Sequence, residues 1–233
     1  MSITKEYLDE LKGRIEEERE EFLKDLVDEE DWVACKGNDH ANLFYKNDPK
    51  SSIKKFKICA VMPCRMATVI SALLDPENRV SWEVLVDSMK TIETFEDGYS
   101  MHYITTKSLA AGLVGRRDFV HFRKIYDNVE KKENELDAKM IIDISCEHPD
   151  YADQKGFVRG TTLFCATIFR EYLENGVYET TYESVTQTDI NGMIPSFFIN
   201  TASKSSTLEW YQKLEGKALA LESELPLEAQ RTI

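Results

Sequence analysis

A long succession of strand patterns followed by one bulky helical pattern limits the fold more than any other feature. Alternating apolar and polar residues between turn residues indicate strands over 32–35, 42–46, 52–61, 88–96, 99–106, 118–127, 139–147, 156–171 and 176–189. Helical patterns cover 64–75 and 76–85, and a last helix runs from Pro195 to about Leu214, with proline in the favoured first turn. This order predicts an α+β domain with a strongly curved antiparallel sheet, whose hollow side holds the last helix.

The first thirty residues predict a helix that packs on the domain. Within 4–27, apolar residues recur at helical spacing, at Leu8, Leu11, Ile15, Phe22, Leu23, Leu26 and Val27. Glu18 interrupts this stripe, which disfavours a coiled coil. We therefore expect three parts: an amphipathic helix within 1–30, the main domain over 31–215, and a loosely attached tail over 216–233.

Acidic charge is concentrated in that first helix. The chain has a formal net charge of −13, and residues 1–31 hold 13 acids and 5 bases, or −8 of the total. This balance disfavours nucleic-acid binding and limits contact with anionic membranes to local patches. The opening residues do not resemble a signal peptide, so a cytoplasmic protein is expected. The five cysteines form no CxxC pair, and the four histidines have no ligand spacing, so neither a metal site nor a cofactor is expected.

One strand pattern has two mixed faces. In GRRDFVHFRKIY, residues 115–126, one face carries Phe119, His121, Arg123 and Ile125, and the other carries Val120, Phe122, Lys124 and Tyr126. A strand that is buried on one side should be apolar there and polar on the other side. A cation among apolar side chains must find a partner, because an unpaired buried charge is costly.

Five motifs together resemble one family. They are NRVSWE (78–83), LAAGLVGRRDFVHFR (109–123), EHP (147–149), KGFVRG (155–160) and TDINGMIPSFFIN (188–200). In this order they are similar to motifs of the START family, the lipid-transfer domains related to steroidogenic acute regulatory protein, over roughly residues 30–215. The resemblance implies a helix-grip fold, in which a curved sheet and the C-terminal helix enclose a hydrophobic tunnel for one lipid. It also implies a non-enzymatic role in carrying or sensing lipid.

The resemblance implies that Phe119, His121 and Arg123 face the tunnel. The steroidogenic protein pairs its arginine with an acid of the preceding strand, but the matching position here is Thr105. If 118–127 and 139–147 form a hairpin, Asp143 comes within reach of Arg123 instead. We therefore expect an Arg123–Asp143 pair that receives a lipid hydroxyl or head group. In the alternative, Arg123 has a purely structural role.

Further residues are expected to contact the ligand. Arg79 and Glu83 are four apart on one helical face and match head-group contacts of the family, although a surface ion pair is the alternative. The positions that form a choline cage in the family are Ile104, Phe119 and Leu163, and only one is aromatic, which disfavours phosphatidylcholine. With these, a mostly apolar lining is expected to include Val185, Ser184, Thr186 and Phe198.

The segment SLAAGLVG, residues 108–115, is unusually apolar for a loop. Leu109, Leu113 and Val114 are flanked by Lys107, Arg116 and Arg117, a combination that suits contact with a membrane interface. We expect a lid over the tunnel that touches membranes transiently. The alternative is a loop that folds back onto the core.

These features favour a monomeric cytoplasmic carrier, peripheral at organelle membranes, for one sterol, phospholipid or ceramide-like lipid. One alternative is a helix-grip enzyme of the cyclase or hydrolase type, with His121 near Asp143 as its acid–base pair. The other is a lipid-sensing regulatory module that docks a partner on its acidic first helix.

Overall fold

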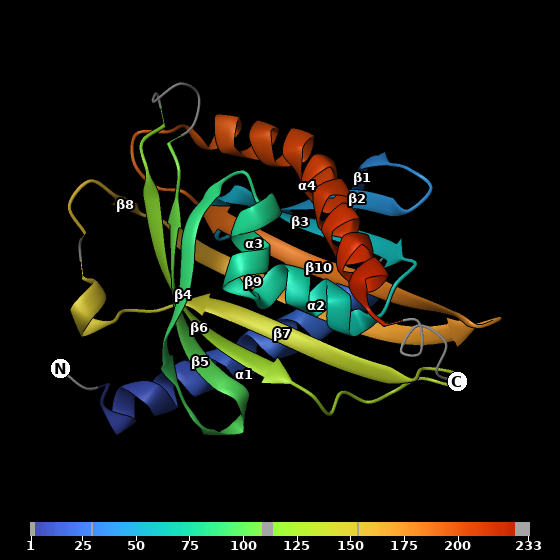
Figure 1. Ribbon diagram of the computed structural model, residues 1–233. Coiled ribbons are helices and arrows are strands. Elements are labelled where there is room, and N and C mark those ends of the chain that lie inside the picture. The colour runs from blue at the N-terminus through green and yellow to red at the C-terminus, as the bar shows by residue number, and fades with distance from the viewer. Residues whose placement is uncertain (1–2, 29, 109–113, 153, 227–233) are drawn as a thin grey trace.

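The computed structural model describes residues 3–28, 30–108, 114–152 and 154–226. Within these ranges, ten strands form one sheet. Nine of them are antiparallel neighbours in the order β1-β2-β3-β10-β9-β7-β6-β5-β4, and the short β8 pairs in parallel with β6 (Figure 1). The strands are β1 (Val33–Gly37), β2 (Ala41–Asp48), β3 (Ser51–Met62), β4 (Val86–Thr94), β5 (Tyr99–Thr106), β6 (Arg117–Tyr126), β7 (Asp137–Ser145), β8 (Val158–Arg159), β9 (Thr161–Glu174) and β10 (Val177–Asp189).

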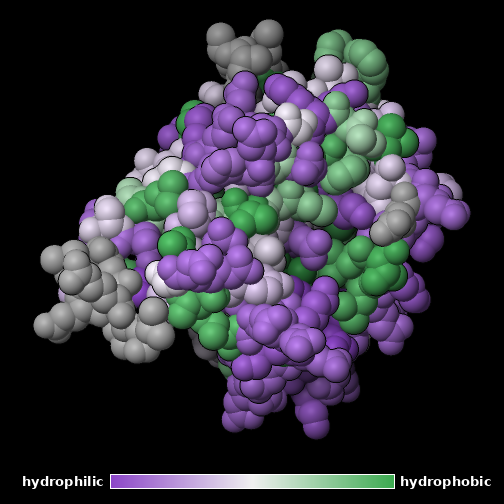
Figure 2. Space-filling model, turned by 90° about the vertical axis from the view of Figure 1, so that its right-hand side faces the viewer, coloured by the Kyte–Doolittle hydropathy of each residue, from purple (hydrophilic) through white to green (hydrophobic). Residues whose placement is uncertain are grey.

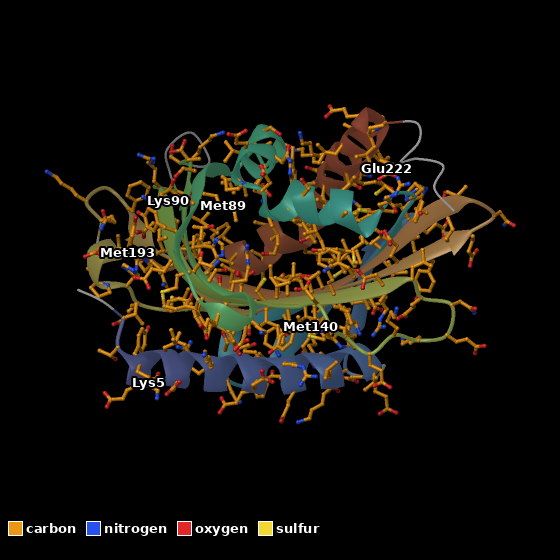
Figure 3. The ribbon with its side chains drawn as sticks, turned by 60° about the horizontal axis from the view of Figure 1, so that its bottom comes forward. Lys5, Met89, Lys90, Met140, Met193 and Glu222 are labelled. Carbon is orange, nitrogen blue, oxygen red and sulfur yellow. The ribbon has the colours of Figure 1, made fainter. Side chains whose placement is uncertain are left out.

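Helices cover both faces of this sheet. They are α1 (Lys5–Val27), α2 (Met66–Leu74), α3 (Pro76–Trp82) and α4 (Ser196–Glu224). Helix α1 lies along the convex face, and α2, α3 and α4 lie on the concave side (Figures 1 and 3). The α+β architecture with a curved antiparallel sheet and a terminal helix in its hollow is thereby confirmed.

Two separate hydrophobic cores follow from this arrangement. The convex core joins Leu11, Ile15 and Phe22 of α1 to alternate residues of the central strands, among them Met140 of β7 (Figure 3). The concave core joins α2 and α4 to the other set of alternate residues. Because strand side chains alternate between faces, one set can serve each core.

The mixed faces of residues 117–126 are explained by this double cover. Val120 and Phe122 of β6 point into the convex core and are fully buried. Arg123 is buried as well, although it belongs to the opposite face. A strand that is covered on both sides has no solvent face, so the usual contrast of one apolar and one polar face does not arise.

Tight turns fix the strand register. Asn175 and Gly176 both have positive φ, 52° and 79°, and form the two-residue connection between Glu174 and Val177. Such a turn needs residues that tolerate this conformation, and Asn-Gly is the favoured pair. The long β9–β10 ladder that it starts spans the centre of the sheet and carries much of the concave wall.

The C-terminal end of α1 is held by a buried ionic network. The Asp25 carboxylate accepts hydrogen bonds from Lys46 and, at 3.2 Å, from Lys55. The Asp25 carbonyl accepts from the Lys57 ammonium and the Trp32 indole, each at 3.2 Å. Lys46 and Lys55 are thus paired with a carboxylate and Lys57 is bound by main-chain carbonyls, which offsets part of the cost of removing these charges from water. Leu23 and Val27 belong to the apolar stripe predicted within residues 4–27, but they are exposed because they lie away from the sheet.

Helix α4 is longer than the sequence pattern indicates. It continues to Glu224 instead of ending near Leu214, so the expectation of a loose tail from residue 216 is wrong for 216–224. Ala218 is fully buried, and the Glu222 carboxylate pairs with Arg65 at the start of α2. These contacts stabilise the extra turns. Among the described residues, no helix is both long and apolar enough to span a bilayer.

Replacing Phe22 by alanine tests the convex core. Phe22 is fully buried, so Phe22→Ala should lower the free energy of unfolding by about 3–5 kcal/mol. The neighbouring Leu23→Ala, at an exposed position, should cost about 1 kcal/mol or less. Urea denaturation measures both values, and equal losses for the two variants would contradict the packing of α1 described above.

Candidate functional site

Two adjoining cavities lie between the concave face and the helices. The inner cavity has a volume of about 210 Å³ and the outer cavity about 500 Å³. Both are lined by Tyr182, Ser184 and Thr186 of β10 and by Trp210 of α4. The outer cavity lies between the first half of α4, the strands β3 and β10, and the connection from α3 to β4.

The inner cavity combines an apolar wall with a few polar groups. Its apolar lining comes from α2 and from four strands of the sheet: Leu73, Leu74, Val86, Met89, Ile104, Ile141 and Phe169. Its polar lining includes Arg79, Arg123, Asp143, His121 and Thr167. A mostly apolar hollow with a small number of placed polar groups is typical of small-molecule sites.

The expected Arg123–Asp143 pair is present in the structure. The two residues are direct cross-strand partners in β6 and β7. Arg123 Nε donates to Asp143 Oδ1 at 2.8 Å, and a terminal nitrogen donates to Oδ2 at 3.1 Å. Both residues are buried, with 6% and 7% of their surface exposed. This two-point geometry is the strongest form of such a pair.

The charges of this pair support each other. Burial by itself raises the pKa of the Asp143 carboxyl, but the Arg123 guanidinium, together with smaller effects of His121 and His102, outweighs burial and holds that pKa below its ordinary value. The pair is therefore ionised at neutral pH. Thr105, at the position where the family has its acid, hydrogen-bonds to Ser88 at 2.7 Å and is the cross-strand partner of Asp118, remote from Arg123.

Two histidines flank the ion pair and stay neutral. His102 and His121 are cross-strand partners in β5 and β6. Burial lowers the pKa of His121 to about 4, with Asp143 opposing and Arg123 adding to the shift, and burial lowers that of His102 to about 3. His121 Nε2 hydrogen-bonds to the Thr162 hydroxyl at 2.9 Å, while both Asp143 oxygens accept from Arg123. Among the described residues, no hydrogen bond joins His121 to Asp143, the acid–base pair of the enzyme alternative.

A second polar cluster stands where the two cavities meet. Arg79 of α3 lies 3.4 Å from the Glu83 carboxylate and within 5.1–5.4 Å of the Trp82 and Trp210 rings. Burial lowers the Arg79 pKa, which Glu83 counteracts. Arg79 Nε is buried and has no hydrogen-bond partner among the described residues. The Trp210 indole donates to the Glu83 carboxylate.

Small hydroxyls add neutral polar groups to the wall. Thr167 Oγ1 and Ser184 Oγ are 2.8 Å apart and hydrogen-bonded, and both line the inner cavity. Thr186 lines both cavities, as does Tyr182, whose pKa is raised to about 12 by burial. Tyr182 was not expected from the sequence, although it has the same strand parity as Ser184 and Thr186. Trp210 was missed because a lone tryptophan on a helix does not indicate which face it occupies.

Four expected lining residues lie elsewhere. Leu163 is the extra residue of a β-bulge, since Phe164 and Thr162 pair with consecutive residues of β10, and it lines an outer groove next to α1. Val185 belongs to the convex core because it alternates with Ser184. Phe198 is 62% exposed on α4. The Phe119 ring covers Gly160, where an added Cβ would lie 2.2 Å from it, and is not part of either lining.

The apolar loop is described only in part. Leu109 and Leu113 lie outside the described residues, and Val114 is half-buried. After the loop, the buried Arg117 donates to the carbonyls of Ile190 and Asn191 at 2.9 and 3.0 Å. The start of β6 and the segment that leads into α4 are therefore joined.

Removing one member of the buried ion pair should destabilise the protein strongly. Arg123→Leu leaves the Asp143 carboxylate buried without its partner, which should cost about 3–5 kcal/mol in unfolding free energy. The double variant Arg123→Leu/Asp143→Leu should recover most of this loss. Thermal and urea denaturation measure the cycle. Additive losses would show that the two side chains act independently.

Acid should destabilise the protein through His121 before Asp143 protonates. The folded-state pKa of His121, about 4, lies below its ordinary value of 6.5, so the unfolded state binds more protons between these pH values. The contribution of His121 to stability should then fall as pH drops from about 6.5 to 4, by at most about 1.4 kcal/mol per pH unit, and His102 adds a loss of the same sign. Denaturation of His121→Asn across this range should show a shallower slope, and an unchanged slope would contradict the shifted pKa.

Comparisons with known proteins agree with this architecture. The model of the START domain family matches residues 13–219. Human StAR-related lipid transfer protein 4 is 23% identical over 193 residues, which is 83% of this chain and 89% of that protein. Mouse StAR-related lipid transfer protein 5 is 28% identical over 137 residues, 59% of this chain and 61% of that protein.

Solved structures show the same fold. The structure of human StAR-related lipid transfer protein 5 superposes with a TM-score of 0.79 at 18% identity, covering 91% of this chain and 98% of that one. Human STARD10 superposes with a TM-score of 0.73 at 17% identity, covering 86% and 78%. The curved sheet that closes on α4 is thus the helix-grip fold that the motifs implied. Since the family model matches most of the chain, this protein belongs to the START domain family.

Proposed function

We propose that this chain binds one lipid in its two adjoining cavities and transfers it between membranes. The observation that carries the proposal is the hollow between the sheet and α4, which is apolar over most of its wall and partly open to solvent. Transfer of a hydrocarbon chain from water into such a hollow is favourable by about 25 cal/mol per Å² of buried apolar surface. Membership of the START family and the names of the similar proteins support the same function.

The charges in the hollow favour a ligand that is neutral at the inner end. Arg123 is matched by Asp143, Arg79 by Glu83, and both histidines are uncharged at neutral pH. Hydroxyl or amide groups can hydrogen-bond to such pairs without adding a buried charge. Sterols and ceramide-like lipids have groups of this kind. Ile104 contributes no aromatic face to a cage for choline, and Leu163 lies outside the hollow, so phosphatidylcholine is the least favoured ligand.

Lipid capture can be measured directly by native mass spectrometry. After incubation with mixed-lipid vesicles, the wild-type protein should carry one lipid per chain. Arg123→Leu/Asp143→Leu should retain the fold but lose at least about tenfold in capture of hydroxyl-bearing lipids, because their polar partner is gone. Arg19→Leu, at an exposed pair with Glu16 on α1, is the matched control and should behave as wild type. Lipid capture by the double variant at the wild-type level would show that the ion pair takes no part in binding the lipid.

An exposed apolar group at the start of α4 supports membrane contact. Met193, Phe197 and Phe198 are 102%, 70% and 62% exposed. Met193 lies at the outer edge of the molecule in Figure 3, and hydrophobic side chains protrude at the upper edge of Figure 2, at the height of the start of α4 in Figure 1. Residues 190–208 include Lys204 and no acid. Exposed aromatic residues without nearby acids suit a membrane interface.

Replacing this apolar group should uncouple membrane contact from lipid capture. Phe197→Ser/Phe198→Ser should weaken binding to phosphatidylcholine vesicles at least about tenfold, because each ring loses about 1.5–3 kcal/mol of apolar burial. Capture of lipid from detergent solution should stay at the wild-type level. Val177→Ser, exposed at the distant β9–β10 turn, is the control. Vesicle co-sedimentation measures binding, and an unaffected double variant would exclude this surface.

A further inference from the structure

Four residues line both cavities, and one of them belongs to a helix. Three of the four residues common to both linings, Tyr182, Ser184 and Thr186, stand in a row on β10. The fourth is Trp210 on α4. The connection between the cavities therefore runs between the Trp210 indole and the β10 surface. The position of this indole decides whether one molecule can occupy both spaces.

Several contacts hold the indole at this position. Its N–H donates to the buried Glu83 carboxylate, its ring lies 5.5 Å from the Trp82 ring, and the Arg79 guanidinium lies 5.4 Å from its centre. A hydrogen bond to a charged acceptor is among the stronger single contacts. It also occupies an acceptor that a ligand hydroxyl would need. Arg79 Nε meanwhile has no acceptor among the described residues. The polar cluster is thus engaged with the indole, and one of its donors is left unused.

The helix around Trp210 is anchored unevenly. On its C-terminal side, Tyr211 and Leu214 are fully buried, and the Tyr211 hydroxyl donates to the Val61 carbonyl at 3.0 Å. On its N-terminal side, no residue between Ile199 and Leu208 is buried. There Ser206 and Thr207 line the outer cavity and donate hydrogen bonds to carbonyls of their own helix. Between Asn200, which hydrogen-bonds to the Lys54 amide and the Ser52 carbonyl, and the buried Leu208, this stretch of α4 is exposed or half-buried, and the outer cavity lies beside it.

The volumes of the two cavities limit which ligands can reach the inner ion pair, and such ligands must pass the indole. Sites for drug-sized molecules are usually about 300–1,000 Å³. The inner cavity, at about 210 Å³, is below this range and too small for a whole lipid, whereas the outer cavity is within it. A lipid whose polar end reaches the Arg123–Asp143 pair must extend through both spaces.

We propose that Trp210 is a displaceable plug between the two cavities, and that a lipid seats fully only when it moves the indole off Glu83. Displacement breaks the indole hydrogen bond and frees the carboxylate for the ligand. The energy of this step sets a barrier to uptake and disfavours ligands too short to fill both spaces. This inference rests on the proposed lipid-binding function and adds the residue that controls entry.

The NMR signals of the indole N–H groups test the displacement of Trp210 in the wild-type protein. Variants are needed only to assign the signals. The chain has three tryptophans, so ¹⁵N–¹H spectra contain three indole signals, which Trp210→Phe and Trp82→Phe assign. Phosphatidylcholine vesicles that contain a fluorescent sterol or a fluorescent ceramide serve as lipid donors. On lipid uptake, the Trp210 indole signal should move to the position of an indole without a charged acceptor. The Trp32 signal, which arises beneath α1, should stay in place.

Uptake rates provide the second measurement. Trp210→Leu and Trp210→Phe remove the indole donor, and each should take up the fluorescent lipids at least about tenfold faster than wild type, equivalent to about 1.4 kcal/mol of barrier. Trp32→Phe is the control, since Trp32 lies beneath α1 in the convex core and belongs to neither lining, and it should keep the wild-type rate. Thermal denaturation establishes that the variants are folded.

The outcomes separate the plug from the proposed function. Faster uptake by the Trp210 variants, together with a shifted Trp210 signal in wild type, supports the plug. If wild type takes up lipid while its Trp210 signal stays fixed, or if the variants are no faster, the plug is overturned and the lipid-binding function stands. If neither wild type nor the variants take up any lipid, the proposed function fails, and the plug fails with it.

Discussion

Covering the sheet on both faces is the constraint from which the other features follow. A single antiparallel sheet usually leaves one face to water, but here α1 seals the convex face and α2, α3 and α4 close the concave one. Each face then has a hydrophobic core of its own, and the two cores are of similar extent. The concave core is packed around α2 and the second half of α4, and the hollow lies beside it, between the sheet, α3 and the first half of α4. A hollow of this kind costs stability in an ordinary core, where each void loses van der Waals contacts.

Buried cations in the hollow are paired with acids, as two of the lysines are in the network under α1. Arg123 with Asp143, and Arg79 with Glu83, bring each buried cation against an acid of a neighbouring position. Lys46 and Lys55 do the same with Asp25 on the convex side. The difference lies in what surrounds the pairs. Under α1, Lys46 and Lys55 border the outer groove that Leu163 lines, whereas the pairs on the concave side line the two cavities.

The fold could be predicted from the sequence because its signals are local or repeated. Strand alternation and the helical stripes each indicate an element, and the Arg123–Asp143 pair followed from the hairpin register together with the strand face that the family resemblance directs into the tunnel. Predictions failed where an element departs from its ideal period. A β-bulge at Leu163 turns that side chain out of phase, and no local pattern marks the bulge. Val185 was placed beside Ser184 and Thr186, although simple alternation puts it on the other face.

Helical positions were harder to assign, because the face of α4 that meets the sheet depends on the axis direction of the helix. Phe197 and Phe198 have the composition of a buried stripe but lie on the outside, while Trp210 lies at the centre of the site. The spacing of residues in the sequence alone does not determine how α4 is rotated about its own axis. The extra turns to Glu224 depend on the partner Arg65, which is more than 150 residues away in the chain.

The opposite placement of α1 and the start of α4 also affects how the molecule approaches a charged surface. The acid-rich helix lies on one side of the sheet, and the acid-free segment 190–208 lies across it (Figures 1 and 3). This separation of the acidic helix from the acid-free segment gives the protein a permanent electric dipole moment. Near an anionic bilayer, repulsion of α1 exerts a torque that turns the opposite side forward. Counter-ions confine this torque to separations of about 8–10 Å, so it would act only over the last step of an approach to such a surface.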